Sequence, residues 1–158
     1  MMARLRPYAP ALLAAVLQIF LLSRLRLLGL CPPLVPAAVF LSGTEEGADR
    51  GAAAGLLAGG VLFLAGGSPW TMALFAALGG LAGAWVTAWA GFFGLWLRFV
   101  PLAAAIEGAL VLVHWPARDA LTAAWAIAGP EFLLTVLCFP VAALLPGLFR
   151  SRRVRPMY

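Results

Sequence analysis

The chain is poor in the residue types on which most enzymes and metal proteins depend. Its 158 residues include no lysine, one histidine, two cysteines and six acidic residues. Without lysine a Walker-type phosphate loop is excluded, and the single histidine, His114, cannot form a metal-binding cluster with others. No serine stands in a GxSxG motif, and Cys31 and Cys138 have no CxxC partner, so both thiols are expected to be buried and inert. The sequence predicts a protein that is not an enzyme and holds neither a metal nor a cofactor.

Charge is scarce as well. Hydrophobic residues make up 64% of the chain and charged residues 11%, whereas a soluble domain is roughly half apolar and about a quarter charged. This composition predicts an integral membrane protein. At roughly 20 residues per crossing, the length accommodates five or six transmembrane helices. No linker divides the chain, so residues 1–158 are expected to form one domain.

The positive charges are all arginines, and the net charge is +5. Four of them stand in a basic tail over residues 150–158: Arg150, Arg152, Arg153 and Arg155. Arginines at the ends of apolar segments are typical of a topology signal rather than of nucleic-acid binding. Beside an anionic leaflet each such charge gains roughly 1 kcal/mol. The expected partner of the tail is therefore the membrane lipid, and no nucleic acid is expected.

The apolar pattern predicts an all-α, polytopic membrane bundle. Six spans are expected, over Tyr8–Leu22, Leu27–Leu41, Gly51–Ala65, Thr71–Ala90, Phe99–Val113 and Glu131–Phe149. The predicted connections include a polar loop over Ser42–Arg50, a turn over Gly66–Trp70, an aromatic border over Gly91–Arg98, and a short interfacial helix over Ala120–Ala128 that Gly129-Pro130 ends. The second span contains several prolines, so it is kinked, begins after them, or is re-entrant.

The arginines also orient the predicted spans. With six spans and a cytoplasmic N-terminus, the inside set is Arg4, Arg6, Arg50, Arg98, Arg150, Arg152, Arg153 and Arg155, and the outside set is Arg24, Arg26 and Arg118. Eight against three favours both termini in the cytoplasm. If the second span does not cross, the count becomes nine against two, so five spans remain an alternative.

Glycines recur at helical spacing in the third and fourth predicted spans. They are Gly51, Gly55 and Gly59 in one, and Gly79, Gly80 and Gly83 in the other. Small residues let helix backbones approach closely in a membrane. The pattern predicts a tight helical hairpin, in which this face either packs within the chain or receives a partner helix.

Two carboxylates stand in or beside apolar segments. Glu107 lies near the middle of the fifth predicted span, where an ionisable group costs several kcal/mol and usually faces a partner or a cavity. It is either a ligand or proton site, half of a buried pair with an arginine, or a packing residue. Glu131 is expected to begin a helix after Pro130, where a carboxylate complements the helix N-terminus.

Several of these features stand in an order that resembles one family. A polar loop (Glu45–Arg50) precedes the glycine-spaced span, the turn Gly67-Ser68-Pro69-Trp70, and a glycine-rich step from Gly79 to Gly83. The last span runs from Pro130 through Pro140 to the arginine tail. Over about two-thirds of the chain this resembles the bacterial rod shape-determining protein MreD family. Phe63 stands where many members carry an acidic residue.

The resemblance implies a non-enzymatic scaffold of the cell-wall elongation machinery in the bacterial inner membrane. Such a protein would bind a bitopic MreC-like partner and link MreB filaments to a RodA-like polymerase and its transpeptidase. Its cytoplasmic contacts would come from the arginine tail and from Glu45, Glu46, Asp49 and Arg50.

The alternative is an S component of an energy-coupling-factor vitamin transporter, whose fold looks similar. In that reading Ala11 and Ala15 would form a docking face. The polar groups available for an extracellular pocket would be Glu107, Glu131, His114 and Trp115.

Overall fold

The computed structural model describes residues 6–22, 33–85, 92–113 and 121–149. These residues fold into helices and contain no β-strand, which confirms the all-α prediction for this part of the chain. The elements are the 3₁₀ turn η1 (Arg6–Tyr8), α2 (Ala9–Leu17), the π-helical turn η2 (Gln18–Leu22), α3 (Val35–Glu46), α4 (Ala48–Leu64), α5 (Trp70–Trp85), α6 (Phe92–Val113) and α7 (Leu121–Phe149).

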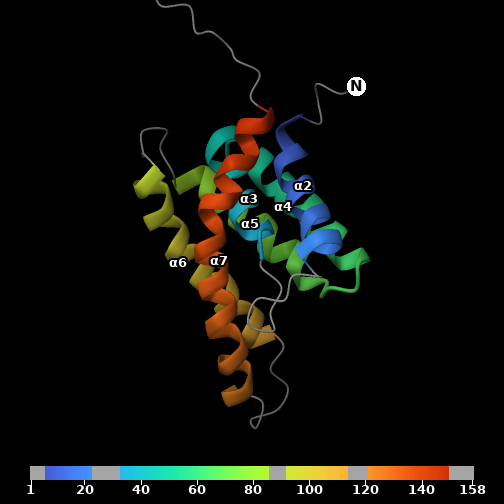
Figure 1. Ribbon diagram of the computed structural model, residues 1–158, viewed down its shortest axis with the longest axis vertical. Coiled ribbons are helices and arrows are strands. Elements are labelled where there is room, and N and C mark those ends of the chain that lie inside the picture. The colour runs from blue at the N-terminus through green and yellow to red at the C-terminus, as the bar shows by residue number, and fades with distance from the viewer. Residues whose placement is uncertain (1–5, 23–32, 86–91, 114–120, 150–158) are drawn as a thin grey trace, which may run out of the picture.

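The helices alternate in direction along the chain. Figure 1 shows the beginning of α2, the junction of α3 with α4 and the end of α7 at the same end of the molecule. The turn between α4 and α5 lies away from that end. Helices α4 and α5 form the closest pair, and α6 packs along α7.

Helix α3 is the centre of the bundle, because α2, α4, α5 and α7 all contact it. Every residue from Val35 to Gly43 is buried. The helix begins after Pro33 and carries Pro36 in its first turn. Backbone N–H groups of the first turn have no partner within the helix, so a proline there costs no hydrogen bond. Within its described residues, the second predicted span is helical from Val35 onward. Its earlier part lies outside the described residues.

The predicted polar loop over Ser42–Arg50 is wrong. Helix α3 continues to Glu46, Gly47 alone forms the bend, and α4 begins at Ala48. Gly47 has φ 94°, a conformation open to glycine at little cost. The hydroxyl of Ser42 donates to the Ala38 carbonyl at 2.9 Å. Polar side chains that bond to their own helix in this way need no loop.

The predicted turn over Gly66–Trp70 is largely confirmed. Gly66 has φ 97°, its N–H donates to the Phe63 carbonyl at 3.0 Å, and the Gly67 N–H donates to the Leu62 carbonyl at 3.0 Å. This pair of bonds is a Schellman motif, which ends α4. Trp70 is the first residue of α5 rather than the last of the turn.

Two predicted boundaries in the second half are wrong. The aromatic border over Gly91–Arg98 is helical from Phe92 onward and forms the first turns of α6. The interfacial helix that was expected to stop at Gly129-Pro130 continues instead, so α7 runs unbroken for 29 residues. An apolar helix tolerates a proline where its neighbours and local adjustment satisfy the freed backbone carbonyl.

The core combines many alanines with larger aliphatic side chains and with phenylalanines, three of which are fully buried. Alanines from α2, α3, α4 and α5 are fully buried beside Phe40, Phe99 and Phe139. The ring centroids of Phe99 and Phe139 are 4.8 Å apart, and those of Phe40 and Phe99 are 5.3 Å apart. These rings join α3, α6 and α7, because each comes from a different one of those helices.

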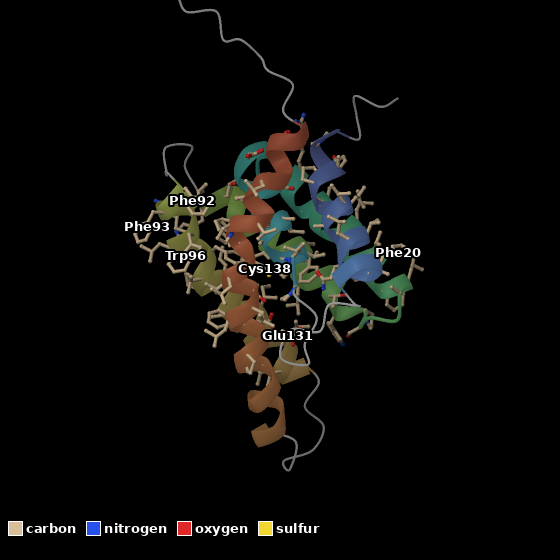
Figure 2. The ribbon with its side chains drawn as sticks, in the orientation of Figure 1. Phe20, Phe92, Phe93, Trp96, Glu131 and Cys138 are labelled. Atoms are coloured by element: carbon tan, nitrogen blue, oxygen red, sulfur yellow. The ribbon has the colours of Figure 1, made fainter. Side chains whose placement is uncertain are left out.

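Large apolar side chains cover the outside. The exposed ones include Phe20, Leu56, Leu57, Leu64, Leu81, Phe93, Leu97, Leu112, Leu133, Leu137 and Leu144. Figure 2 shows Phe20 and Phe93 on opposite sides of the molecule. Within the described residues one helix, over Phe92–Leu112, is long and apolar enough to cross a membrane. Shorter apolar stretches lie over Ala9–Phe20, Trp70–Trp85 and Ala128–Leu144.

Candidate functional site

The predicted glycine face lies in the contact between α4 and α5. A Cβ on Gly55 would fall on the Phe75 carbonyl, and a Cβ on Gly59 would come 2.7 Å from the Cα of Met72. At the other end of the hairpin, a Cβ on Gly83 would meet the backbone at Gly47 and Ala48. Only glycine permits this backbone separation, because each obstructing atom belongs to the main chain.

One predicted member of this face packs less closely than the others. A Cβ on Gly80 would lie 3.6 Å from the Cβ of Ala52 in α4, which is an ordinary van der Waals distance. Gly43 also takes part, and it was missed because its segment was predicted to be a loop. A Cβ on Gly43 would fall on the Gly79 carbonyl, and a Cβ on Gly51 would lie 2.5 Å from the Gly43 Cα. Helices α3, α4 and α5 therefore meet at Gly43, Gly51 and Gly79, here called the glycine junction.

The alanine face of α2 is also internal. Ala11 and Ala15 are fully buried, and α2 contacts α3, α4 and α7. The expectation that these two alanines form a docking face for a transporter subunit is therefore wrong. Phe63, by contrast, is exposed near the end of α4.

A polar group lies between α6 and α7. Glu107 is 9% exposed and Thr135 is fully buried. The Thr135 hydroxyl lies 2.9 Å from the Glu131 carbonyl oxygen of its own helix and 3.5 Å from Glu107 Oε1. A hydroxyl has one proton, so the shorter contact is the better hydrogen bond and Glu107 is held only weakly.

The two carboxylates of this group are placed differently from the prediction. Glu107 lies fifteen residues after Phe92, in the last third of α6 rather than at the middle of a span. Glu131 does not begin a helix. It lies inside α7, nearer to the N-terminal than to the C-terminal end of that helix (Figure 2). In the described part of the chain no arginine forms an ion pair with Glu107.

The charged end of the α3–α4 pair is exposed. Arg50 Nη1 donates to Glu46 Oε2 at 2.8 Å, one helical turn apart across the bend. Glu45 and Asp49 are exposed nearby, and Asp49 lies in the first turn of α4, where a carboxylate favours the helix N-terminus. The tail residues Arg150, Arg152, Arg153 and Arg155 lie outside the described residues.

Gln18 is a further functional candidate that sequence reasoning missed. Its Oε1 accepts hydrogen bonds from the backbone N–H groups of Leu34 and Val35, at 3.0 and 3.2 Å. These groups belong to the start of α3, where backbone donors have no partner within the helix. The π-helical turn η2 begins at Gln18, and a single polar residue in an apolar segment was the available signal.

Within residues 6–22, 33–85, 92–113 and 121–149, no three side chains of His, Cys, Asp and Glu gather as a metal site. The hydroxyls of Ser42 and Thr44 donate to carbonyls of α3. Neither hydroxyl is therefore presented to a general base in this structure.

No family model matches this chain, and neither a curated protein nor a solved structure matches it significantly. Its function is accordingly inferred from its residues and their geometry.

Proposed function

We propose that this protein is a multi-pass inner-membrane scaffold of the bacterial cell-shape and peptidoglycan elongation machinery. It would have six transmembrane helices and both termini in the cytoplasm. The observation that carries the proposal is the α4–α5 hairpin, closed by main-chain contacts at its glycines and by the Schellman turn at Gly66. This is the segment whose sequence resembles the MreD family.

The distribution of apolar side chains supports insertion in a membrane. Leu64 is 86% exposed, Phe93 71% and Leu144 71%, while the core contains many alanines. Soluble monomers rarely expose large contiguous apolar patches. In a bilayer the same surface faces lipid, and small residues at the helix contacts are the usual arrangement.

The course of the helices supports an even number of crossings. The start of α2 and the end of α7 lie at the same end of the molecule (Figure 1). The exposed Glu46–Arg50 pair lies at the α3–α4 junction, which is at that end too. Placing this end in the cytoplasm agrees with the predicted excess of arginine inside.

The proposed scaffold would use surfaces that are not consumed by packing between its own helices. The glycines of α4 and α5 are occupied within the chain. An MreC-like transmembrane helix would therefore bind an outer face, and MreB would contact the charged end formed by Glu45, Glu46, Asp49 and Arg50. Linking both to a RodA-like polymerase and its transpeptidase requires rigidity rather than catalysis, and the glycine junction provides rigidity.

Co-purification with an MreC-like protein and MreB tests this role. We expect the wild-type chain to retain both. Asp49→Lys with Arg50→Glu should reduce MreB recovery several-fold while leaving the MreC-like partner bound, because the reversed charges lie at the exposed end. Ser68→Lys in the distant turn is the matched control. Recovery of neither partner with a well-folded wild-type chain would refute the scaffold.

Cysteine accessibility tests the six-span topology separately. In a background lacking Cys31 and Cys138, we expect Ser68→Cys to react in intact cells with a membrane-impermeant maleimide. Glu45→Cys should react only after the membrane is opened. Reaction of both positions from outside would contradict the cytoplasmic placement of the α3–α4 junction.

The polar group of Glu107, Thr135 and Glu131 favours the second candidate, an S component of a vitamin transporter. Buried polar side chains in a membrane protein commonly serve ligands. Binding measurements with candidate vitamins distinguish the two functions. A bound vitamin whose affinity falls in Glu107→Gln would favour the transporter subunit over the scaffold.

A further inference from the structure

A row of three oxygen atoms joins α6 to α7. Glu107 Oε1 of α6 lies 3.5 Å from Thr135 Oγ1 of α7, and that Oγ1 lies 2.9 Å from the backbone carbonyl oxygen of Glu131. Glu107 is 9% exposed and Thr135 is fully buried. Buried polar atoms need hydrogen-bond partners within the protein, so the state of this row depends on where its protons lie.

The proton of Thr135 belongs to the shorter contact. A carbonyl oxygen carries no proton, so the 2.9 Å contact is a bond that Thr135 donates to Glu131. The hydroxyl has only one proton, and Oγ1 is then left as an acceptor toward Glu107. An ionised Glu107 is also an acceptor only, so two acceptors would face each other at 3.5 Å. A neutral carboxylic acid has an O–H that donates to Oγ1 and completes the row.

The charged surroundings of Glu107 disfavour its ionised form as well. Helix α6 packs against α3, α5 and α7. The ionisable side chains that these three helices carry are Glu45, Glu46, Glu131 and Cys138. None of them is cationic, and a charged Glu131 repels a charge on Glu107. Arg98 lies nine residues before Glu107 on α6, which is about 14 Å along the helix axis. His114 and Arg118 lie outside the described residues.

The two helices have room to separate beside this group. Gly108 directly follows Glu107, and Gly129 stands two residues before Glu131. No described atom lies within 4 Å of a Cβ built on either glycine. Glu131 is itself partly exposed. A small shift of α6 from α7 would therefore bring water to Glu107 without forcing other side chains to move.

We propose that Glu107 is a neutral carboxylic acid in the folded protein, that it donates a hydrogen bond to Thr135 Oγ1, and that its ionisation at higher pH loosens α6 from α7. The acid loses its proton to water and becomes a carboxylate. A buried charge without a partner is costly, so the helices part until water reaches it. The α6–α7 contact is thus a pH-sensitive switch. This inference goes beyond the scaffold role and does not depend on it, because it concerns the packing of the chain alone.

Infrared spectroscopy of the full-length protein in a non-ionic detergent tests the protonation state. Subtracting the spectrum of Glu107→Gln from that of the wild type isolates the carboxyl group of residue 107. At pH 6 we expect the C=O stretching band of a neutral carboxylic acid, and at pH 9 carboxylate bands in its place. Carboxylate bands alone at pH 6 would overturn the proposal, and so would a neutral band that persists at pH 9.

The same band tests the direction of the hydrogen bond. In Thr135→Val the acid loses its acceptor, so its C=O band at pH 6 should move to higher frequency. Thr135→Ser keeps a hydroxyl at this position and should leave the band near its wild-type frequency. An identical band in the wild type and in Thr135→Val would show that Glu107 does not donate to Thr135.

The pH dependence of unfolding tests the link between the proton and the fold. In the unfolded chain Glu107 meets solvent and is ionised above about pH 5, so unfolding releases the proton that the folded protein holds. Stability should therefore fall as the pH rises, and the unfolding constant should rise by up to about tenfold per pH unit. Between pH 5 and pH 7 we expect a rise about fivefold larger, or more, in the wild type than in Glu107→Gln. Equal rises would contradict the linkage.

Glu131→Gln is the matched control. It removes the second carboxylate but keeps the backbone carbonyl to which Thr135 donates. This variant should retain the neutral band at pH 6 and a pH-dependent stability. If both effects vanish in Glu131→Gln and persist in Glu107→Gln, the titrating group is Glu131 and the proposal fails. If Glu107→Gln does not fold, the difference between pH 6 and pH 9 in Glu131→Gln decides: loss of a neutral band supports the proposal, and no such loss overturns it.

Hydrogen exchange measured by mass spectrometry tests whether the loosening is local. The wild type and Glu107→Gln are compared at the same pH, so the intrinsic pH dependence of exchange cancels. At pH 9 peptides of α6 and α7 should exchange severalfold faster in the wild type, whereas the α4–α5 hairpin should exchange equally in both. At pH 6 the two proteins should agree throughout. Equal exchange of α6 and α7 at pH 9, or faster exchange along the whole chain, would overturn the switch.

Discussion

Gly51 and Gly79 lie so close together that a Cβ on either residue would fall on the carbonyl oxygen of the other. The contact is reciprocal and joins main chain to main chain, so no rotamer change can relieve a substitution at either position. Gly43 of α3 meets the same two backbones. The close packing of α3, α4 and α5 therefore depends on the absence of a side chain at these three glycines.

Gly55→Ala should lower the free energy of unfolding by about 2 kcal/mol or more, since overpacking costs typically 1–3 kcal/mol. The new methyl would fall on the Phe75 carbonyl, so α4 and α5 would have to separate. Unfolding in detergent, followed by circular dichroism, measures the loss. Gly60→Ala in the same helix is the control, because its Cβ would meet only the Met72 side chain at 3.7 Å. Equal stability of the two variants would contradict the close contact.

Gln18→Met should destabilise the bundle by about 1–3 kcal/mol, because two buried backbone donors at the start of α3 would lose their acceptor. The side chain is similar in size, so packing changes little. Gln18→Glu retains an acceptor oxygen beside the positive end of α3 and should lose much less. Thermal unfolding of the three proteins in one detergent compares them. If the methionine variant is as stable as wild type, the bonds to Leu34 and Val35 contribute nothing.

Phe139→Ala should cost about 3–5 kcal/mol, the usual range for a fully buried phenylalanine. Its ring contacts those of Phe40 and Phe99, at centroid separations of 5.9 and 4.8 Å. Leu137→Ala, two residues away on α7, removes a side chain that is 69% exposed and should change stability little in a membrane-mimetic medium. A similar loss in both variants would show that the outer face of α7 is covered as tightly as the core.

Thr135→Val should destabilise the α6–α7 pair by about 0.5–1.5 kcal/mol, because the Thr135 hydroxyl bonds mainly to the Glu131 carbonyl and holds Glu107 only through the longer 3.5 Å contact. Glu107→Gln should cost less than about 1 kcal/mol, since the amide both donates and accepts. Replacing both partners, with Glu107→Leu and Thr135→Val, should be less harmful than the sum of the single changes. A double-mutant cycle of unfolding free energies measures this coupling. Strict additivity would show that the 3.5 Å contact has no energetic role.

Short sequence patterns predicted the structure correctly where the stabilising hydrogen bonds join residues that are close together in the sequence. The turn at Gly66 and Gly67 was predictable because its hydrogen bonds connect residues only three to five positions apart. The loop predicted over Ser42–Arg50 failed for the opposite reason. Its polarity is accommodated by hydroxyl bonds to α3 and by an exposed ion pair across the bend, neither of which composition distinguishes from a solvated loop.

The continuation of α7 through Gly129 and Pro130 is a second feature that local sequence patterns did not predict. Sequence propensity favours a stop there, and α7 nevertheless runs on to Phe149. Helix α7 packs against α3 and α6, and this packing stabilises the helix as a whole. A tertiary contact thus overrides a local breaker, and no pattern within the segment reveals it.

By itself the sequence determined a helical, lipid-compatible chain with a close hairpin, because apolar content, helical glycine spacing and turn chemistry are local properties. The tertiary structure decided which glycines touch, that α3 is the buried centre, that Gln18 supplies acceptors to its first turn, and that Glu107 faces Thr135. Each of these joins residues on different helices. Their separation in space depends on how whole helices pack, and that depends on the combined shape of all their faces.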